Sequence, residues 1–392
     1  MQTNKRLNIV CWAFPSWNGE YLKSTVQLMK ELSLRHNVIY IDYAYTMKDI
    51  LSKRKDNAVH FSNIFGKTFG IREEITIDNA TINVLSLPPI IPINWINGSK
   101  LYDCIETINS KIVQKRIMNA LNKLNFKPDI IINAFNPFFS KASESIFKNT
   151  PLVYYCYDNI DAMQWASKHG SRLEKTLLKS ASATVFSSEQ LQKTKSLDIN
   201  SFVVNNGVDT TNFGIYFNSE VNTAKRKIAG YVGSIDDRID YALLKATIEE
   251  NMNLDFHFIG KINSQNALEL KKYNNVTFFG PKSAEDLPGL MSTFDAGLIP
   301  FVKNDFTKNI YPMKVNEYLA LGIPVIMTDF ADLSDLAGYT EVTKNAKEFS
   351  EALNRSLEND NQNARIARHK KAFSNSWQEK GYALEKIILR YA

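Results

Sequence analysis

The sequence contains few of the residues from which disulfides and metal sites are built. Its 392 residues include three cysteines and five histidines. Cys11, Cys104 and Cys156 are odd in number and far apart, which argues against a disulfide framework and indicates a reducing compartment. The histidines follow no metal-binding spacing, and no pair of carboxylates stands out as a metal site. We therefore expect neither a metal nor another cofactor.

Long hydrophobic runs are also missing. No stretch approaches about 18 uninterrupted apolar residues, so we predict no transmembrane helix. The opening segment is basic and has a short apolar run, but Asn8 interrupts that run and no small-residue cleavage site follows. Both features argue against a signal peptide. We expect a cytoplasmic protein, with the inner face of the cell membrane as a second possible location.

A G-x-G-x-x-G fingerprint is absent, which argues against a dinucleotide site. The chain is long enough for two domains, and 44% of its residues are apolar, as in a globular protein. The polar stretch Asn218–Lys227 suggests a linker. We expect a first domain over 1–205, joined by a C-terminal helix over 376–392, and a second domain over 206–375.

Positive charge is concentrated in the first half. Residues 1–205 contain 25 Lys and Arg against 17 Asp and Glu, while the rest of the chain contains 22 against 24. A basic first half suggests an anionic partner there. No nucleic-acid recognition motif is present, so we expect no nucleic acid. An anionic membrane surface or a lipid diphosphate is the better candidate.

Residues 44–99 combine basic residues, aromatic residues and the proline-rich segment Pro88–Ser99, which includes Trp95. Basic side chains beside exposed aromatic rings are typical of a peripheral membrane contact. The alternative is a loop that packs on its own domain.

The chain opens with a strand, loop, helix and strand, which predicts a parallel α/β sheet. The first strand is expected at Leu7–Ala13, and the loop after it contains Trp17, Asn18 and Gly19. Loops at the carboxyl ends of parallel strands bind ligands. We therefore predict an acceptor-side contact at these three residues, with a simple turn as the alternative.

A later strand, Pro151–Tyr157, leads directly into Asp158, and Asp161 follows. A carboxylate at this edge could take a proton from a substrate hydroxyl. We predict Asp158 as the general base and Asp161 as an acceptor-side residue. Helix capping by either aspartate is the alternative.

Residues 309–329 predict a helix, a turn and a buried strand. Pro312 suits a first helical position, and Gly322 suits the end of the helix. The first turn would present free N–H groups and Lys314 to an anion such as a diphosphate. Glu317 lies on the same face and could accept hydrogen bonds from vicinal ribose hydroxyls. A buried α/β unit with an unremarkable Lys and Glu is the alternative.

A second anion site is expected after the strand at Ile228–Val232. Gly233 and Ser234 lie in a tight loop before a helix. Arg238 could bind a phosphate with two hydrogen bonds. Its alternative is an ion pair with Asp236 or Asp237.

The motif P-x-K-x-x-E-Y-x-A-x-G-x-P-V at 312–325 resembles the nucleotide-sugar signature of GT-B glycosyltransferases, especially the retaining family 4. The segment N-G-V-D at 206–209, followed by Phe213, is similar to the family's signature between its two domains. Met313-Lys314 resembles the donor site of the inverting xanthan glucuronosyltransferase family. The Y-D-x-x-D segment at 157–161 resembles the first domain of bacterial polysaccharide glycosyltransferases, and in the xanthan family an Asp in this region is the general base. Trp377 resembles the tryptophan at which the family's last helix crosses back to the first domain.

The resemblance implies roles for individual residues. Glu317 would hold the donor ribose, with Met313 and Lys314 beside the donor. Lys261 would neutralise the diphosphate, and the transferred sugar would lie near Asn309, which stands where family 4 has a second Glu. The nucleobase would contact the backbone of Phe279, Gly280 and Pro281. Asp158 would be the base of an inverting reaction, or would position the acceptor in a retaining one.

We thus expect a GT-B fold of the α/β class: two doubly wound Rossmann-like domains facing a cleft, with a C-terminal helix crossing back. The expected activity is transfer of a hexosyl or uronosyl group from a UDP-sugar, without a metal. The expected acceptor is a glycan, carried on a polyprenyl diphosphate, in bacterial surface polysaccharide synthesis. Two alternatives stay open: a nucleotide-sugar epimerase on the same fold, and a non-catalytic nucleotide-sugar-binding subunit of a glycan-assembly complex.

Overall fold

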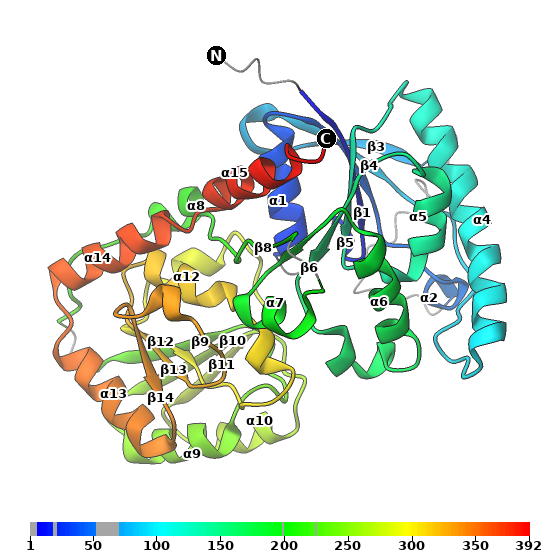
Figure 1. Ribbon diagram of the computed structural model, residues 1–392. Helices are drawn as coiled ribbons and strands as arrows, with labels where there is room; N and C mark the ends of the chain where they lie inside the picture. The colour runs from blue at the N-terminus through cyan, green and yellow to red at the C-terminus, as the bar shows by residue number, and fades with distance from the viewer. Residues whose placement is uncertain (1–5, 19–21, 52–69, 198–199, 224–225) are drawn as a thin grey trace. The chain divides into compact units, whose positions relative to one another are not determined.

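The structure is a computed structural model that describes residues 6–18, 22–51, 70–197, 200–223 and 226–392 (Figure 1). The chain divides into two compact units. Unit 1 comprises Met1–Asn205 and Lys380–Ala392, and unit 2 comprises Asn206–Glu379.

Unit 1 is organised around an eight-stranded sheet in the order β3-β4-β2-β1-β5-β6-β7-β8. Only the β3–β4 pair is antiparallel; the other neighbouring strands are parallel. The strands are β1 (Asn8–Ala13), β2 (Asn37–Ile41), β3 (Ile71–Ile75), β4 (Thr81–Leu85), β5 (Ile130–Ala134), β6 (Leu152–Cys156), β7 (Ala183–Phe186) and β8 (Ser201–Val203).

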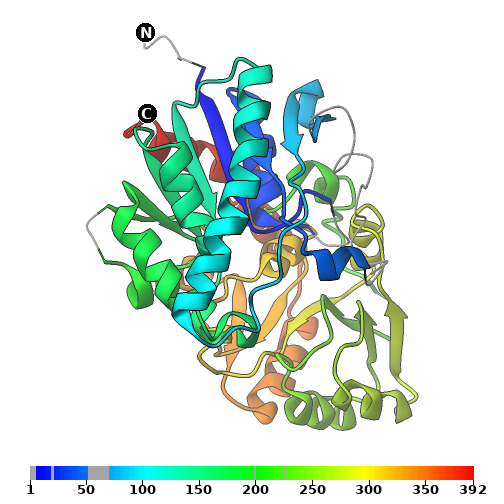
Figure 2. The ribbon, with the colours of Figure 1, turned by 90° about the vertical axis from the view of Figure 1, so that its right-hand side faces the viewer.

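Helices cover both faces of this sheet, with α4 and α5 on one side and α1 and α15 on the other (Figures 1 and 2). Successive residues of a strand face opposite sides, so Val10 and Trp12 of β1 pack in one cluster with Val113 and Ile117 of α4. The helices assigned to this unit are α1 (Ser24–Ser33), α2 (Met47–Leu51), α4 (Ser99–Lys123), α5 (Ser140–Ile146), α6 (Gly170–Ser180), α7 (Glu189–Lys195) and most of α15 (Trp377–Ile388).

Helix α15 brings the end of the chain back to unit 1. Gly381 lies so close to α1 that a Cβ there would be 2.6 Å from the Cβ of Glu31. The Glu385 carboxylate accepts a hydrogen bond from Arg35 Nε at 2.6 Å and contacts His36 Nε2 at 2.9 Å. Because the Leu7 N–H donates to His36 Nδ1 at 3.2 Å, the proton of the neutral ring is on Nε2 and points to Glu385.

Unit 2 contains a six-stranded parallel sheet in the order β11-β10-β9-β12-β13-β14. The central strands are almost wholly buried, as expected of a parallel sheet covered on both faces. The strands are β9 (Ile228–Val232), β10 (Asp255–Ile259), β11 (Val276–Gly280), β12 (Ala296–Ile299), β13 (Val325–Thr328) and β14 (Thr340–Thr343).

The helices of unit 2 lie on both faces of its sheet, with α9 and α13 on one side and α12 on the other (Figure 1). Their bounds are α8 (Thr210–Gly214), α9 (Tyr241–Glu250), α10 (Asn266–Glu269), α11 (Leu287–Met291), α12 (Met313–Ala320), α13 (Ala346–Glu358) and α14 (Gln362–Phe373).

Each sheet has a point at which the strand order reverses. In unit 1, β1 pairs with β2 on one side and with β5 on the other. In unit 2, β9 lies between β10 and β12. The loops at the carboxyl ends of such a pair leave in opposite directions and open a crevice, which is where α/β sheets bind ligands.

The attachment of α15 can be tested at Glu385. We expect Glu385→Ala to lower the free energy of unfolding by about 1–3 kcal/mol, because the side chains of Arg35 and His36 lose a largely buried hydrogen-bond partner. Urea denaturation measures the change. Lys386→Ala, an exposed neighbour on the same helix, is the control. Equal stability of the two variants would contradict this role of Glu385.

Candidate functional site

The carboxyl edge of the unit 2 sheet is built around the β9/β12 reversal. The loops that follow these two strands are hydrogen-bonded to each other: Asp240 N donates to Pro300 O, and Val302 N donates to Arg238 O, both at 2.8 Å. These bonds join the loop that begins at Gly233 to the segment that leads into α12.

Glycines end the strands on one side of this edge. Gly233 and Gly260 have φ values of 148° and 150°, and a Cβ on Gly260 would be 1.8 Å from the Gly233 carbonyl oxygen. Only glycine permits so close an approach of two backbones. Ser234 follows, and its Oγ accepts a hydrogen bond from Asn263 Nδ2 at 2.9 Å. The predicted Gly233-Ser234 loop therefore lies at the carboxyl edge.

Helix α12 is attached to the strand before this loop, because the Val232 N–H donates to the Tyr318 hydroxyl at 3.0 Å. Pro312 is its N-cap rather than its first helical residue, so the prediction for Pro312 was one position early, and Met313 is the first residue of the helix. The extended ψ of 124° at Pro312 explains the shift. Gly322, with φ at 74°, ends the helix in the left-handed conformation as predicted.

Lys314 and Glu317 form an ion pair on the first turn of α12. The two side chains differ in burial: 23% of the Lys314 side chain is exposed, against 3% for Glu317. The lysine can thus reach an anion at the surface, whereas the carboxylate stays inside. The pairing keeps a nearly buried carboxylate compensated when no ligand is bound.

The N-G-V-D segment packs directly against α12. Asn316 Nδ2 donates to Asn206 O at 3.0 Å, and Asn206 Nδ2 donates to Tyr311 O at 2.7 Å. Gly207 is required here, because a Cβ would lie 2.9 Å from the backbone nitrogen of Trp377. Asp209 caps α8, because its side chain accepts a hydrogen bond from the Asn212 N–H. Two segments a hundred residues apart thus form one support for the start of the helix.

The other predicted donor residues surround this edge with different partners. Asn309 is buried at 1% exposure, and its amide donates to Asp305 O at 2.8 Å. Arg238 makes two hydrogen bonds of 2.8 Å to Asp236, which is the alternative considered for it. Burial opposes ionisation of Asp236, but the Arg238 guanidinium outweighs it and lowers the pKa of that carboxyl.

Lys261 follows β10 and is exposed. At the end of β11, Phe279 is 38% exposed, Gly280 has φ at 69° and Pro281 is exposed. Their predicted roles toward a diphosphate and a nucleobase stay predictions.

The carboxyl edge of unit 1 contains the predicted acceptor-side residues. Asp158 follows β6 and accepts a hydrogen bond from the backbone of Asn159 at 2.8 Å. Asn159, not either aspartate, caps the short helix η3 (Ile160–Ala162) through the Asp161 N–H. The capping alternative for the aspartates is therefore wrong at this helix. Phe135, just after β5, has φ at 54°, an uncommon conformation for a bulky residue and one often found near functional sites.

Asp161 belongs to a charge cluster that the sequence did not reveal. Lys195 donates to Asp161 at 3.0 Å and also pairs with Glu174, and both Lys195 and Glu174 are almost fully buried. Tyr154 donates to Glu174 at 2.7 Å. Burial disfavours the charge on Lys195, but the two carboxylates outweigh it and raise the pKa of the amine. The cluster joins the loop after β6 to α6 and α7.

The loop after β1 has a structural partner at the end of β2. The Trp17 N–H donates to Asp42 at 2.8 Å, and the Trp17 ring contacts Tyr40 with centroids 5.1 Å apart. Asn18 is exposed and its carbonyl accepts from Lys23 at 2.7 Å. Gly19 lies outside the described residues. Trp17 is buried at 8% exposure, so its ring packs inside unit 1.

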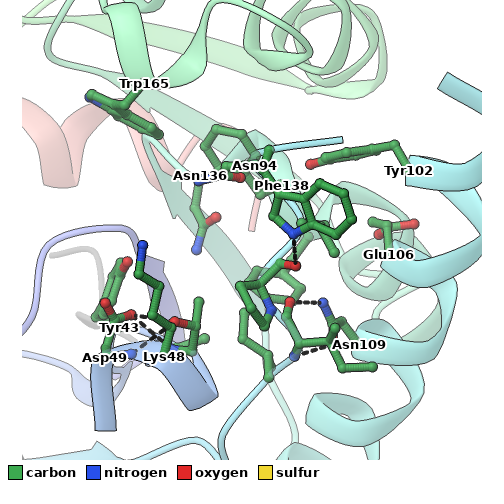
Figure 3. Close-up of a pocket in the computed structure, with 18 of the residues that line it drawn as sticks. Tyr43, Lys48, Asp49, Asn94, Tyr102, Glu106, Asn109, Asn136, Phe138 and Trp165 are labelled. Carbon is green, nitrogen blue, oxygen red and sulfur yellow. Dashed lines mark hydrogen bonds between the residues drawn. The ribbon is translucent and has the colours of Figure 1, made fainter. Parts of the chain in front are cut away.

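A cavity of about 490 Å³ opens in unit 1 between the loops after β1, β2, β4 and β5 and helix α4 (Figure 3). Tyr102, Glu106 and Trp165 line it, and none of them was predicted as a site residue. Asn136 also lines it and was likewise not predicted as a site residue. The one sequence signal for a site here was the aromatic and proline-rich composition of the segment 44–99, which we interpreted as a membrane contact.

The described part of the chain bears on two other predictions. No group of three or more His, Cys, Asp or Glu side chains there could hold a metal ion. No helix in that part is both long and apolar enough to cross a membrane. In the segment 44–99, of which 52–69 are not described, Met47, Ile91 and Trp95 are exposed.

Residues 226–359 match the family model described as Glycosyl transferases group 1. TuaH of Bacillus subtilis (strain 168), whose name assigns it provisionally to teichuronic acid biosynthesis as a glycosyltransferase, is 25% identical over 112 residues. That match spans 28% of this chain and 28% of TuaH, so it covers little more than a quarter of this relative.

Solved structures resemble nearly the whole chain. Sucrose-phosphate synthase from Thermosynechococcus elongatus has a TM-score of 0.71 at 14% identity, over 98% of this chain and 99% of that one. The catalytic domain of starch synthase IV from Arabidopsis thaliana, bound to ADP and acarbose, has a TM-score of 0.67 at 11% identity, over 99% of each chain. At such identities the likeness concerns the fold.

These findings confirm the GT-B fold class, with two Rossmann-like α/β units built on parallel sheets. They also confirm the predicted enzyme class, a glycosyltransferase, for the segment 226–359. The narrower resemblance to family 4 and to the xanthan enzymes stays a prediction.

The buried charge cluster of unit 1 can be tested at Lys195. We expect Lys195→Met to destabilise the protein by about 3–5 kcal/mol, because it leaves Glu174 buried without a cation. Urea denaturation measures the loss. Lys193→Met, on the same helix but exposed, is the control. Adding Glu174→Gln to Lys195→Met should restore part of the stability; no restoration would contradict a charge-based role.

Proposed function

We propose that this protein is a glycosyltransferase that moves a hexosyl or uronosyl group from a UDP-sugar to a glycan acceptor. The observation that carries the proposal is the Lys314–Glu317 pair on the first turn of α12. The pair lies after β12 at the strand-order reversal, within the segment that matches group 1 glycosyltransferases.

The donor diphosphate would bind at the start of α12. Free backbone N–H groups, the helix dipole and the Lys314 ammonium all favour an anion there. Lys314 would then turn from Glu317 to the diphosphate. The ribose hydroxyls would donate hydrogen bonds to the buried Glu317 carboxylate in its place. Gly233, Ser234, Arg238 and Lys261 would complete the phosphate contacts.

The nucleobase would lie on the backbone of Phe279, Gly280 and Pro281. The transferred sugar would lie near Met313 and Asn309. Positive groups of the protein neutralise the leaving diphosphate in this arrangement, so we propose no requirement for a metal.

The chemical step joins an acceptor hydroxyl to the anomeric carbon of the sugar. The acceptor oxygen forms a bond to that carbon, the bond from the carbon to the diphosphate oxygen breaks, and UDP leaves with the bonding electrons. In an inverting reaction Asp158 takes the hydroxyl proton. In a retaining reaction Asp158 positions the acceptor.

The acceptor is proposed to be a glycan on a polyprenyl diphosphate, used in bacterial surface polysaccharide synthesis. The basic first half of the chain supports an anionic acceptor, and the name of TuaH assigns that relative provisionally to teichuronic acid biosynthesis. The exposed Met47, Ile91 and Trp95 in the segment 44–99 support a peripheral contact with the inner face of the membrane.

A UDP-release assay with crude lipid-linked acceptor separates this proposal from its alternatives. Transfer predicts UDP release that depends on acceptor. An epimerase would convert the sugar without acceptor. A non-catalytic subunit would bind UDP without any turnover. We keep this alternative because Asn309 stands where family 4 has a glutamate.

The donor assignment is tested by comparing UDP with uridine in calorimetry. We expect Glu317→Ala to weaken binding of both ligands by about 1–3 kcal/mol, because both lose the partner of their ribose hydroxyls. Lys314→Ala should weaken UDP binding and leave uridine binding nearly unchanged, because uridine has no phosphate. Glu341→Ala, exposed and paired with Arg355, is the control.

Unchanged affinity of Glu317→Ala for both ligands would remove the ribose role. Binding of ADP as tight as that of UDP would contradict the choice of uracil and leave the diphosphate site standing.

The base is tested by Asp158→Asn. If Asp158 takes the proton, turnover should fall on the order of 10²-fold or more with unchanged UDP affinity, because an amide cannot accept it. Glu351→Gln, at an exposed pair with Lys347, is the control. Near-normal turnover, or a product whose NMR spectrum shows retained anomeric configuration, would contradict the base.

A further inference from the structure

The cavity of unit 1 has both apolar walls and polar atoms. Its volume of about 490 Å³ lies within the range of roughly 300–1,000 Å³ usual for small-molecule sites. Asn136, Phe138 and Trp165 lie around one side of it, and Tyr102 and Glu106 of α4 lie on the other (Figure 3).

Three side-chain atoms of these residues are buried and make no hydrogen bond: the Tyr102 hydroxyl, Glu106 Oε2 and Asn136 Oδ1. The three residues are 0%, 2% and 4% exposed. Glu106 Oε2 faces Lys141 Nζ at 3.3 Å, and Ser110 donates to the other oxygen. The Asn136 amide is oriented by its Nδ2, which donates to Ala13 O at 3.1 Å. Glu106 Oε2 is thus already compensated by the Lys141 ammonium, whereas the Tyr102 hydroxyl and Asn136 Oδ1 have no partner. An unpaired buried polar atom is costly, so a ligand that pairs these two atoms would be bound with a gain.

The chemistry of these atoms specifies what the ligand must offer. A carboxylate oxygen and an amide oxygen only accept hydrogen bonds. Burial raises the pKa of Tyr102, so its hydroxyl stays protonated and can donate or accept. The ligand must therefore supply hydroxyl or N–H donors at more than one position.

The aromatic rings of the cavity set a second requirement, which is that the ligand also has an apolar surface. Trp165 stacks on Phe14 with centroids 5.0 Å apart and an interplanar angle of 10°, yet 43% of Trp165 remains exposed. Phe138 contacts the same indole at 5.6 Å. Trp95, which also lines the cavity, is 68% exposed. Large exposed aromatic faces at a cavity are suited to a ligand with a flat apolar face.

A pyranose ring meets both requirements, because its C–H groups form apolar faces and its hydroxyls project from the edges. An isoprenoid chain meets only one of them: it would cover the aromatic rings, but it has no hydrogen-bonding group for Asn136 Oδ1 or the Tyr102 hydroxyl. Excluding water from those atoms without replacing it would cost affinity.

We propose that this cavity is a saccharide site, in which a sugar ring lies against Trp165 and its hydroxyls form hydrogen bonds with Asn136 Oδ1 and the Tyr102 hydroxyl. The inference deepens the proposed function and rests on it in one respect: the bound sugar is the acceptor. Unit 1 would then recognise the sugar of a lipid-linked acceptor rather than its lipid chain.

Tyr102→Phe is the sharpest test, because it removes one hydroxyl that has no protein partner. Binding would be measured by saturation-transfer NMR and tryptophan fluorescence with neutral, N-acetylated and uronic methyl pyranosides. Farnesyl phosphate serves as the lipid probe. We expect at least one pyranoside to bind, and Tyr102→Phe to weaken it about 3- to 10-fold without lowering Tm. Tyr155→Phe, which removes a buried hydroxyl outside the cavity, is the matched control.

Trp165→Ala is a second variant and should weaken binding of the same pyranoside by a similar factor or more. Ile108 is exposed on α4, and Ile108→Ala should leave that binding unchanged. The proposal is overturned if no pyranoside binds, if farnesyl phosphate alone binds, or if both cavity variants bind as the wild type does. UDP titration of each variant keeps the two proposals apart. Normal UDP binding without pyranoside binding overturns the saccharide site alone, and pyranoside binding without UDP binding overturns the donor site alone.

Discussion

The Tyr318 hydroxyl holds the candidate donor site in place. It accepts a hydrogen bond from Val232 N at 3.0 Å and donates to Gly230 O at 3.2 Å, so it joins α12 to β9 inside the core. The ladder between β9 and β12 pairs Ala229 with Ala296 and Gly230 with Gly297. The β9–β12 ladder ends at the Gly230–Gly297 pair. The Tyr318 hydroxyl therefore supplies a partner for the Val232 N–H and the Gly230 carbonyl, since buried backbone groups need hydrogen-bond partners.

Glycine at 297 makes this arrangement possible, since a Cβ there would be 2.5 Å from the Tyr318 ring. The tyrosine therefore lies flat on β12 while its hydroxyl reaches β9. With the middle of α12 fixed to two strands, its first turn is fixed at the carboxyl edge. The positions of Lys314 and Glu317 follow from that anchor.

Two ion pairs of the protein show how burial separates a binding group from a structural one. Lys195 is 4% exposed and contacts two carboxylates, so releasing it for a ligand would leave buried charge uncompensated. Lys314 has one carboxylate partner and is 23% exposed. It can turn to a phosphate provided that the ligand also offers hydroxyls to Glu317. A nucleoside diphosphate carries both groups, which is why the pair supports that ligand and not a simple anion.

The sequence alone determined the elements whose signals are local. The strand predicted at Ile228–Val232 is confirmed with the same bounds as β9. The spacing of Lys314 and Glu317 placed them on one helical face because three residues make nearly one turn. Only the tertiary structure joined Asp161 to Lys195 and Glu174, and only it brought Tyr102, Asn136 and Trp165 to one cavity. Apolar periodicity is set by residues a few positions apart, whereas the partners of these side chains are set by how strands and helices pack, which no short stretch of sequence encodes.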